Sequence, residues 1–168
     1  MAVEVGRLGT VAGVELTLDI RSERFDSPIA AELIEEMAAD MTERYGSGDA
    51  TPIDPANFEA PRGAFFVAYL DGKPVGSAGW RTFAGDPDAA EMKRVFVRPG
   101  ARNRGVATAL LRTLEESARA AGRTRMILET GAAQPEAIAL YLKVGYTRIA
   151  DFGHYKDEPD VRSYGRDL

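Results

Sequence analysis

A chain of 168 residues, with 45% hydrophobic and 28% charged residues, has the length and balance of one globular domain. It has no cysteine, which excludes disulfides, thiolate metal sites and a cysteine nucleophile, and its formal net charge of −5 argues against a nucleic-acid-binding protein. Because no run of about 18 apolar residues is present and the start does not resemble a signal peptide, we expect a single cytoplasmic domain over residues 1–168, with no membrane partner.

The first half of the chain predicts strands, one long helix and a long loop. Alternation of apolar and polar residues, or a turn signal such as Asp71-Gly72, marks the strands. We expect these strands at residues 14–20, 64–70, 75–83 and 90–97. Ser27 and Pro28 open a helix whose apolar residues recur every four positions up to Tyr45. Residues 46–63 are rich in Gly, Pro and Asp and predict a long loop, with one short helix after Asp54.

The second half predicts two further helices between strands. The helices are expected at residues 103–121 and 135–144, each followed by a glycine. The strands are expected at residues 125–129, 146–152 and 161–168. The order of elements is β-α-β-β-β-α-β-α-β-β, which indicates a mixed α/β (α+β) domain without internal repeats.

The strongest functional signal is the segment VFVRPGARNRGVA at residues 95–107, in which a strand leads through a turn directly into a helix. The first N–H groups of a helix lack partners and its N-terminus is positive, so main-chain donors alone can hold a diphosphate. Gly105 and Ala107 allow close approach to the backbone, while Arg102 and Arg104 add positive charge.

The charge around this turn favours an anion site over a purely structural glycine. Residues 92–114 include six basic residues and no acidic one. The alternative is that Gly105 only allows the helix to pack closely on the sheet. The pattern is neither a Walker loop nor a dinucleotide-binding fingerprint, since the spacing of its glycines differs from both.

The residues V-x-P-x-x-R-x-x-G-x-A-x-x-L-L, from Val97 to Leu111, resemble motif A of the GNAT acetyltransferases. The resemblance implies that this turn holds the pyrophosphate of acetyl-CoA and that the preceding strand pairs with the pantetheine arm. The cofactor-binding residues implied here are Val95, Phe96, Val97, Arg102, Asn103, Arg104, Gly105, Val106, Ala107 and Thr108.

A second GNAT-like pattern follows at the expected separation. Residues 128–141 (LETGAAQPEAIALY) and 143–146 (KVGY) resemble the family's L-E-x, Asn, A-x-x-L-Y and G-F/Y series. Gln134 stands where the family usually has Asn. The resemblance implies that Gln134, Ala137 and Tyr141 contact the cofactor arm.

Acetyl transfer to an amine requires a base for the amine and a proton for the departing thiolate. By resemblance, Tyr141 is the proton donor; the alternative is a core aromatic side chain. Glu91 and Glu129 are both candidates for the base, and the alternative for each is an ion pair with an arginine such as Arg94 or Arg125. Oxyanion stabilisation is expected from the N–H of Phe96 or Val97.

The expected acceptor is a small molecule, because the long loop at residues 46–63 could cover a pocket. Residues 15–59 carry twelve acidic and three basic residues, which suits a cationic acceptor, although a solvated helix face accounts for them equally well. Alternatives are a protein or peptide N-terminus or lysine, and a non-catalytic module that binds acyl-CoA. His154 is the only histidine and is expected in an exposed loop, so no metal is expected.

The resemblance therefore implies an acetyl-CoA-dependent N-acetyltransferase that works by direct attack of a primary amine. The implied fold is a mixed, splayed sheet of six to seven strands flanked by about four helices. The splay, between the strand ending at Val97 and the strand ending at Glu129, creates the cofactor slot. The family also makes a homodimer through the terminal strands plausible.

Overall fold

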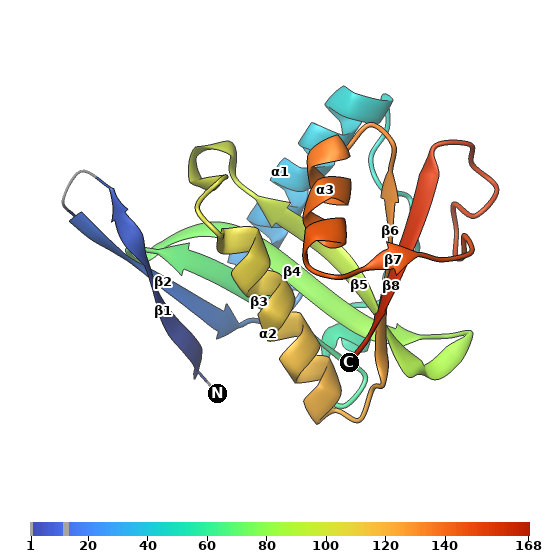
Figure 1. Ribbon diagram of the computed structural model, residues 1–168, viewed down its shortest axis with the longest axis horizontal. Coiled ribbons are helices and arrows are strands. Elements are labelled where there is room, and N and C mark those ends of the chain that lie inside the picture. Colours follow the sequence, from blue (N-terminus) through green and yellow to red (C-terminus); the bar gives the residue numbers. More distant parts are fainter. Residues whose placement is uncertain (1, 12–13) are drawn as a thin grey trace.

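The computed structural model describes residues 2–11 and 14–168, with side chains from residue 15 onward. An eight-stranded sheet runs through the molecule in the order β1-β2-β3-β4-β5-β6-β8-β7 (Figure 1). The strands are β1 (Ala2–Val11), β2 (Val14–Ser22), β3 (Gly63–Leu70), β4 (Lys73–Phe83), β5 (Asp86–Val97), β6 (Arg125–Gly131), β7 (Thr147–Arg148) and β8 (Val161–Asp167). The helices are α1 (Pro28–Tyr45), α2 (Val106–Ala120) and α3 (Pro135–Lys143), with 3₁₀ turns η1 (Pro55–Phe58) and η2 (Pro99–Ala101).

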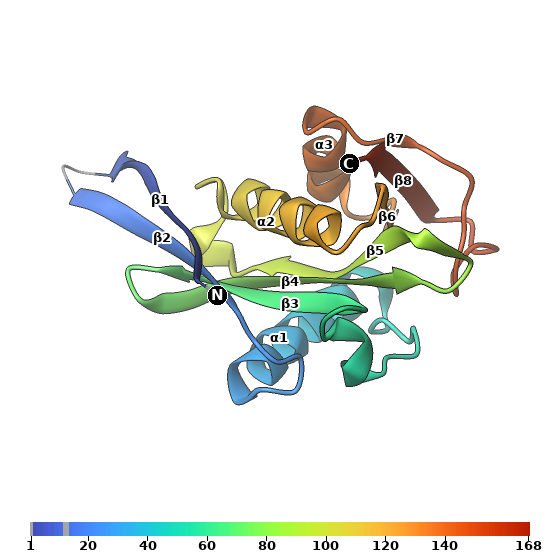
Figure 2. The ribbon, with the colours of Figure 1, turned by 90° about the horizontal axis from the view of Figure 1, so that it is seen from below.

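Helices cover both faces of the sheet, with α1 on one side and α2 and α3 on the other (Figure 2). Successive side chains of β3 therefore enter different cores, because side chains alternate between the faces of a strand. Phe65 and Val67 pack with Leu33 and the rest of the α1 face. Phe66 and Ala68 belong to the larger core beneath α2.

The sheet splits between β5 and β6. These parallel strands pair only from Ala89↔Arg125 to Glu91↔Ile127, after which β5 stays with β4 and β6 stays with β8. The predicted splay between the two strand ends is therefore confirmed. It opens a gap at the carboxyl ends of β5 and β6, which neighbouring strands do not fill.

A bulge in β5 lies at the start of this gap. The register of β4 against β5 shifts between Ser77↔Phe96 and Gly79↔Lys93, so β5 has one extra residue. Arg94 has a φ of 57°, in the left-handed region that residues other than glycine rarely adopt. Bulges of this kind turn the following backbone and often lie beside active sites.

Most expected elements are present, with four differences. The sheet gains β1, which the sequence analysis did not predict because glycines at positions 6 and 9 lower its strand propensity. The described residues contain three α-helices where about four were expected. The strand expected at residues 146–152 is reduced to β7, because beyond it the Asp151 carboxylate, not a main-chain carbonyl, accepts the Ser163 N–H.

The helix expected from residue 103 begins at Val106. Gly105, its N-cap, has a φ of 79° and Asn103 has a φ of 60°, so the chain turns before the helix starts. No helix among the described residues is long and apolar enough to cross a membrane. The homodimer stays a prediction; of the two terminal strands, only β1 lies at an edge of the sheet.

Candidate active site

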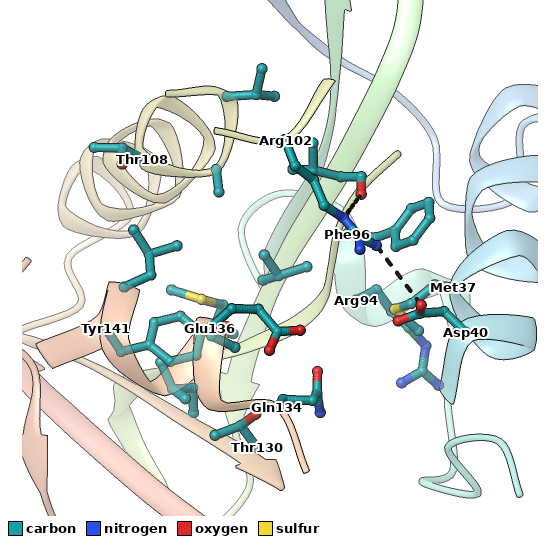
Figure 3. A pocket seen from close by; sticks show the side chains of 18 of the residues that line it. Met37, Asp40, Arg94, Phe96, Arg102, Thr108, Thr130, Gln134, Glu136 and Tyr141 are labelled. Atoms are coloured by element: carbon teal, nitrogen blue, oxygen red, sulfur yellow. Dashed lines mark hydrogen bonds and ion pairs between the residues drawn. The ribbon is translucent and has the colours of Figure 1, made fainter. Parts of the chain in front are cut away.

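A cavity of about 640 Å³ occupies the gap between β5 and β6. Its walls come from α1, the end of β5, the turn before α2, the end of β6 and α3. Figure 3 shows side chains of β6 and α3 facing those of β5, the turn and α1 across it. The cavity thus brings together the two sequence segments that carry the GNAT-like patterns.

The turn at residues 102–105 ends this cavity with main-chain donors. Gly105 caps α2 without any side-chain hydrogen bond to the helix, and the first helical bond runs from the Ala109 N–H to the Gly105 carbonyl at 3.0 Å. The N–H groups of Val106, Ala107 and Thr108 therefore lack helical partners. Together with the positive end of the helix, they form a site suited to an anion such as a diphosphate.

The backbone of β5 offers a free donor along the same cavity. The Arg98 N–H donates to the Val75 carbonyl at 2.7 Å, so Arg98 and Phe96 point their main-chain groups toward β4. By alternation, those of Val97 point toward the gap. Arg102 Nε donates to the Val97 carbonyl at 2.9 Å, in agreement with this orientation (Figure 3). Of the two predicted oxyanion donors, Val97 has the open N–H.

Glu91 is buried and committed to an ion pair. Its carboxylate accepts a hydrogen bond from Arg81 Nε at 3.0 Å, and Arg81 also donates to the Pro52 carbonyl. Lys93 Nζ lies 3.9 Å away on the other side. Glu91 is absent from the lining of the cavity. The ion-pair alternative therefore describes Glu91, with Arg81 as the partner in place of Arg94 or Arg125.

Glu129 lines the cavity, and its carboxylate is free of hydrogen bonds. Its side chain is only 6% exposed, and both oxygens are buried without a hydrogen-bond partner among the described residues. Lys93 Nζ lies 3.6 Å from Oε1. Burial raises the pKa of Glu129, and the nearby Glu91 and Asp49 carboxylates raise it further, against the lowering effect of Lys93. Such a carboxylate is well suited to accept a proton near neutral pH.

Lys93 and Asp49 form a buried charge cluster that the sequence analysis missed. Lys93 Nζ lies 3.5 Å from Asp49 and 3.3 Å from the Thr51 hydroxyl. Asp49 also pairs with Arg94 and accepts hydrogen bonds from the Thr51 N–H and hydroxyl. Burial alone would raise the pKa of Asp49, but Lys93, Thr51 and Arg94 lower it to about 2. No local pattern could signal this cluster, because its members come from a loop and a distant strand.

Tyr141 lies on α3 and faces the cavity from the side opposite Arg102 (Figure 3). It packs edge-on against Tyr146, with ring centroids 5.9 Å apart, but its hydroxyl makes no hydrogen bond with the described residues. Burial raises the pKa of Tyr141 to about 12, so the phenol stays protonated at neutral pH. Tyr141 is therefore a buried aromatic residue that also lines the cavity, and its role as proton donor stays a prediction.

All of the remaining cofactor-binding residues that were predicted line the cavity, except Arg104. Gln134 and Ala137 line it, and Gln134 Nε2 donates to the Tyr45 hydroxyl at 3.3 Å. Arg104 is exposed and is not among the lining residues. His154 is exposed beside Tyr155, as expected, and does not line this cavity or the second cavity described below. Among the described residues no cluster of three or more His, Asp or Glu side chains could hold a metal ion.

A second cavity, of about 410 Å³, adjoins the first and shares Glu129 and Lys93 with it. Its other walls are the end of α1, the loop that follows, and the segment between β7 and β8. The two loops are joined at Asp49, whose carboxylate accepts a hydrogen bond from the Tyr155 hydroxyl at 3.1 Å. The Ala50 N–H donates to the same hydroxyl at 2.5 Å. Asp49 and Tyr155 both line the second cavity, so this contact lies in its wall.

The chain matches known acetyltransferases along most of its length. The acetyltransferase (GNAT) family model matches residues 30–146. An IAA acetyltransferase of Azospirillum brasilense is 34% identical over 137 residues, which cover 80% of this chain and 89% of that protein. A Klebsiella pneumoniae structure described as an acyl-CoA N-acyltransferase is 25% identical with a TM-score of 0.74, over 90% of this chain and 97% of that one. A Salmonella typhimurium structure solved with its cofactor acetyl-CoA has a TM-score of 0.67 at 22% identity, over 90% of this chain and 94% of that one. The protein therefore belongs to the GNAT acetyltransferase family.

Proposed function

We propose that this acetyltransferase transfers the acetyl group of acetyl-CoA to the primary amine of a small molecule held in the second cavity. The observation that carries the proposal is the position of Glu129. Its buried carboxylate has no hydrogen bond and faces both cavities, so it can receive a proton from an amine that approaches from the second one.

The residues of the first cavity fit acetyl-CoA. Free N–H groups of Val106, Ala107 and Thr108 suit the diphosphate, and no carboxylate belongs to the turn at residues 102–105. The outward-facing backbone of Val97 suits an amide of the pantetheine arm. When bound, acetyl-CoA supplies an acetyl group already activated as a thioester.

Three groups of this chain would then divide the work of the reaction. Glu129 takes a proton from the acceptor's ammonium and leaves a neutral amine. The Val97 N–H, fixed by the preceding bulge, donates to the acetyl oxygen as negative charge develops there. Tyr141 gives its phenolic proton to the departing sulfur.

The two raised pKa values suit these opposite roles. A carboxylate with a raised pKa is a better base than an exposed one, and burial has that effect on Glu129. Burial raises the pKa of Tyr141 to about 12, so the phenol keeps its proton at neutral pH and has one to give as the C–S bond breaks.

A small acceptor is favoured over a protein by the size of the second cavity, which is about 410 Å³. The Asp49–Tyr155 contact joins two of the loops that line it. Volumes of about 300–1,000 Å³ are usual for small-molecule sites.

Calorimetric titration with acetyl-CoA, with ATP and dephospho-CoA as controls, tests the cofactor assignment. Release of free thiol in the presence of an amine library, which includes lysine-containing and N-terminal peptides, tests the acceptor class. We expect saturable binding of acetyl-CoA and turnover with small amines. A folded protein that does not bind acetyl-CoA, or that acetylates only peptides, would contradict the proposal.

A further inference from the structure

The second cavity is acidic, in contrast to the first. Its lining includes four carboxylates and one cationic side chain, namely Asp49, Glu129, Glu158, Asp160 and Lys93. The first cavity has five cationic side chains in its lining against four carboxylates, which suits phosphates at one end. The acidic character of the second cavity thus belongs to the side where the acceptor would bind.

Two of the acidic side chains in the second cavity have no ion pair to neutralise them. Asp49 is matched by Lys93 and Arg94. Glu158 and Asp160 are exposed and make no ion pair with any described residue. Of the two nearby cations in the chain, Lys156 makes no ion pair with either of them, and Arg162 directs Nη1 to the carbonyls of Pro159 and Val161, at 2.9 and 2.7 Å.

Glu129 provides a third carboxylate with unused hydrogen-bonding capacity, at the inner end of the same cavity. It is nine-tenths buried, and both of its oxygens lack a hydrogen-bond donor. A buried carboxylate without donors is costly unless a ligand completes it. Glu129 pairs with Ser163 across the β6–β8 ladder. Asp160 lies three residues before Ser163, which is roughly 10 Å along an extended strand.

We propose that the acceptor is a small amine that carries a second cationic group. The reacting nitrogen lies at Glu129, and the second cation lies at the mouth of the cavity between Glu158 and Asp160. The inference rests on the proposed function and specifies its acceptor. In the reaction a C–N bond forms and the C–S bond of the thioester breaks. One proton passes from the ammonium to Glu129 before attack, and Tyr141 gives its proton to the sulfur. After the C–N bond forms, the nitrogen loses a second proton, which restores the Tyr141 phenol, and the second cation is unchanged.

The test compares three straight-chain compounds of similar length: 1,4-diaminobutane, 1-aminobutane and 4-aminobutanoate. Longer α,ω-diamines then define the best spacing between the two nitrogens. We expect the diamine to have the highest kcat/KM and the amino acid the lowest. The double variant Glu158→Gln/Asp160→Asn should lower kcat/KM for the diamine about tenfold and leave that for 1-aminobutane nearly unchanged, as expected for two solvent-exposed ion pairs.

Asp157→Asn is the matched control, because Asp157 is an exposed acid of the same segment that does not line the cavity. It should leave the preference for the diamine unchanged. Equal kcat/KM for the diamine and 1-aminobutane, or a preference that survives the double variant, would overturn the inference while leaving acetyl transfer intact.

Calorimetric titration of 1,4-diaminobutane into the protein, with and without saturating CoA, separates this inference from the proposed function. Diamine binding that weakens about tenfold in the double variant supports the acidic acceptor site, even if no acetylation is observed. Absence of diamine binding by a protein that binds acetyl-CoA contradicts the inference alone. Absence of acetyl-CoA binding contradicts the proposed function alone.

Discussion

The two adjoining cavities are built in different ways. In the first, the groups suited to the diphosphate and the pantetheine arm are main-chain groups of one continuous segment: the bulged end of β5, the turn at residues 102–105 and the start of α2. The second depends on side chains from separate parts of the chain, such as Asp49, Glu129, Tyr155 and Glu158. Main-chain geometry is specified by local sequence, whereas a side-chain site is assembled only when the fold is complete.

This difference explains why the family is easier to infer than the acceptor. The turn needs small residues and a left-handed glycine at fixed spacing, and those requirements appear in the sequence as a pattern. The acceptor cavity needs only suitable charge at positions that the fold brings together, and many sequences meet that need. Variants of the two cavities should therefore differ in which kinetic parameter they change.

The largest expected effect is at Glu129, one of the residues that line both cavities. Glu129→Gln removes the proposed base and keeps its size, so kcat should fall about a thousandfold. Binding of acetyl-CoA should change little. The measurement is steady-state thiol release with the best amine from the library, together with calorimetric titration of acetyl-CoA.

Glu91→Gln is the matched control for this variant. It leaves Arg81 with a weaker partner in a buried position, so the expected loss is in thermal stability, of about 1–3 kcal/mol, with kcat within about tenfold of wild type. If Glu91→Gln lowers kcat more than Glu129→Gln does, the assignment of the base is reversed.

The pH profile of the wild type sharpens the same assignment. The base must be deprotonated to act, and burial raises the pKa of Glu129, so kcat should fall as pH falls through a value above the ordinary 4.5 of a glutamate. This acidic limb should be absent from Glu129→Gln. The phenol of Tyr141, with a pKa of about 12, should produce no loss of activity near neutral pH.

Tyr141→Phe should lower kcat about a hundredfold with little change in acetyl-CoA affinity, because only the proton donor is removed. Tyr146→Phe is the matched control. Its hydroxyl donates to Glu115 Oε1 at 2.9 Å in a buried network, away from the cavity lining. It should reduce stability by about 1–2 kcal/mol and leave kcat nearly unchanged. Equal kcat values for Tyr141→Phe and the wild type would remove the donor role.

Gly105→Glu tests the main-chain site of the first cavity. A carboxylate at the start of α2 would repel a diphosphate, so the Kd for acetyl-CoA should rise about thirtyfold. Gly105 has a φ of 79°, which disfavours any side chain. Gly105→Ala adds a side chain without a charge, so it measures the effect of backbone strain alone. Gly100→Glu adds the same charge at a nearby glycine with open space around it, outside the cavity lining, and should bind acetyl-CoA almost normally. Normal binding by a folded Gly105→Glu protein would contradict the phosphate assignment.

The sequence predicts the first cavity far better than the second. The turn, Tyr141 and both glutamates were identified because each lies within or beside a continuous pattern. The same patterns gave the splay and nearly all of the helices and strands. They could not tell Glu91 from Glu129, because the difference depends on Arg81, which reaches Glu91 across the β4–β5 ladder.

The missed residues are connected by long-range contacts. Asp49 meets Arg94, 45 positions later, and Tyr155, 106 positions later. No periodicity or turn signal links such positions, because the contacts depend on how the long loop folds back over β5. Lys93 was counted only as part of a basic stretch; its burial among three carboxylates became visible only in the fold.

The smallest expected effect tests the contact between Asp49 and Tyr155 in the wall of the second cavity. Tyr155→Phe removes the hydroxyl that donates to Asp49 and accepts from the Ala50 N–H, at 3.1 and 2.5 Å. The two loops would then hold their positions less firmly. We expect kcat/KM for the amine to fall about fivefold, equivalent to about 1 kcal/mol for one partly buried hydrogen bond, with the Kd for acetyl-CoA unchanged.

Tyr45→Phe is the matched control for Tyr155→Phe, because Tyr45 also lines the second cavity but its hydroxyl accepts from Gln134 instead. It removes the same group without touching the Asp49 contact. One contrary result is that Tyr155→Phe lowers acetyl-CoA affinity by the same factor as kcat/KM for the amine. That result would mean that the loop contact affects both cavities together. The separation between a main-chain donor site and a side-chain acceptor site would then fail. An effect confined to the amine would show that the fold can change its acceptor by altering a few distant side chains while the donor site stays the same.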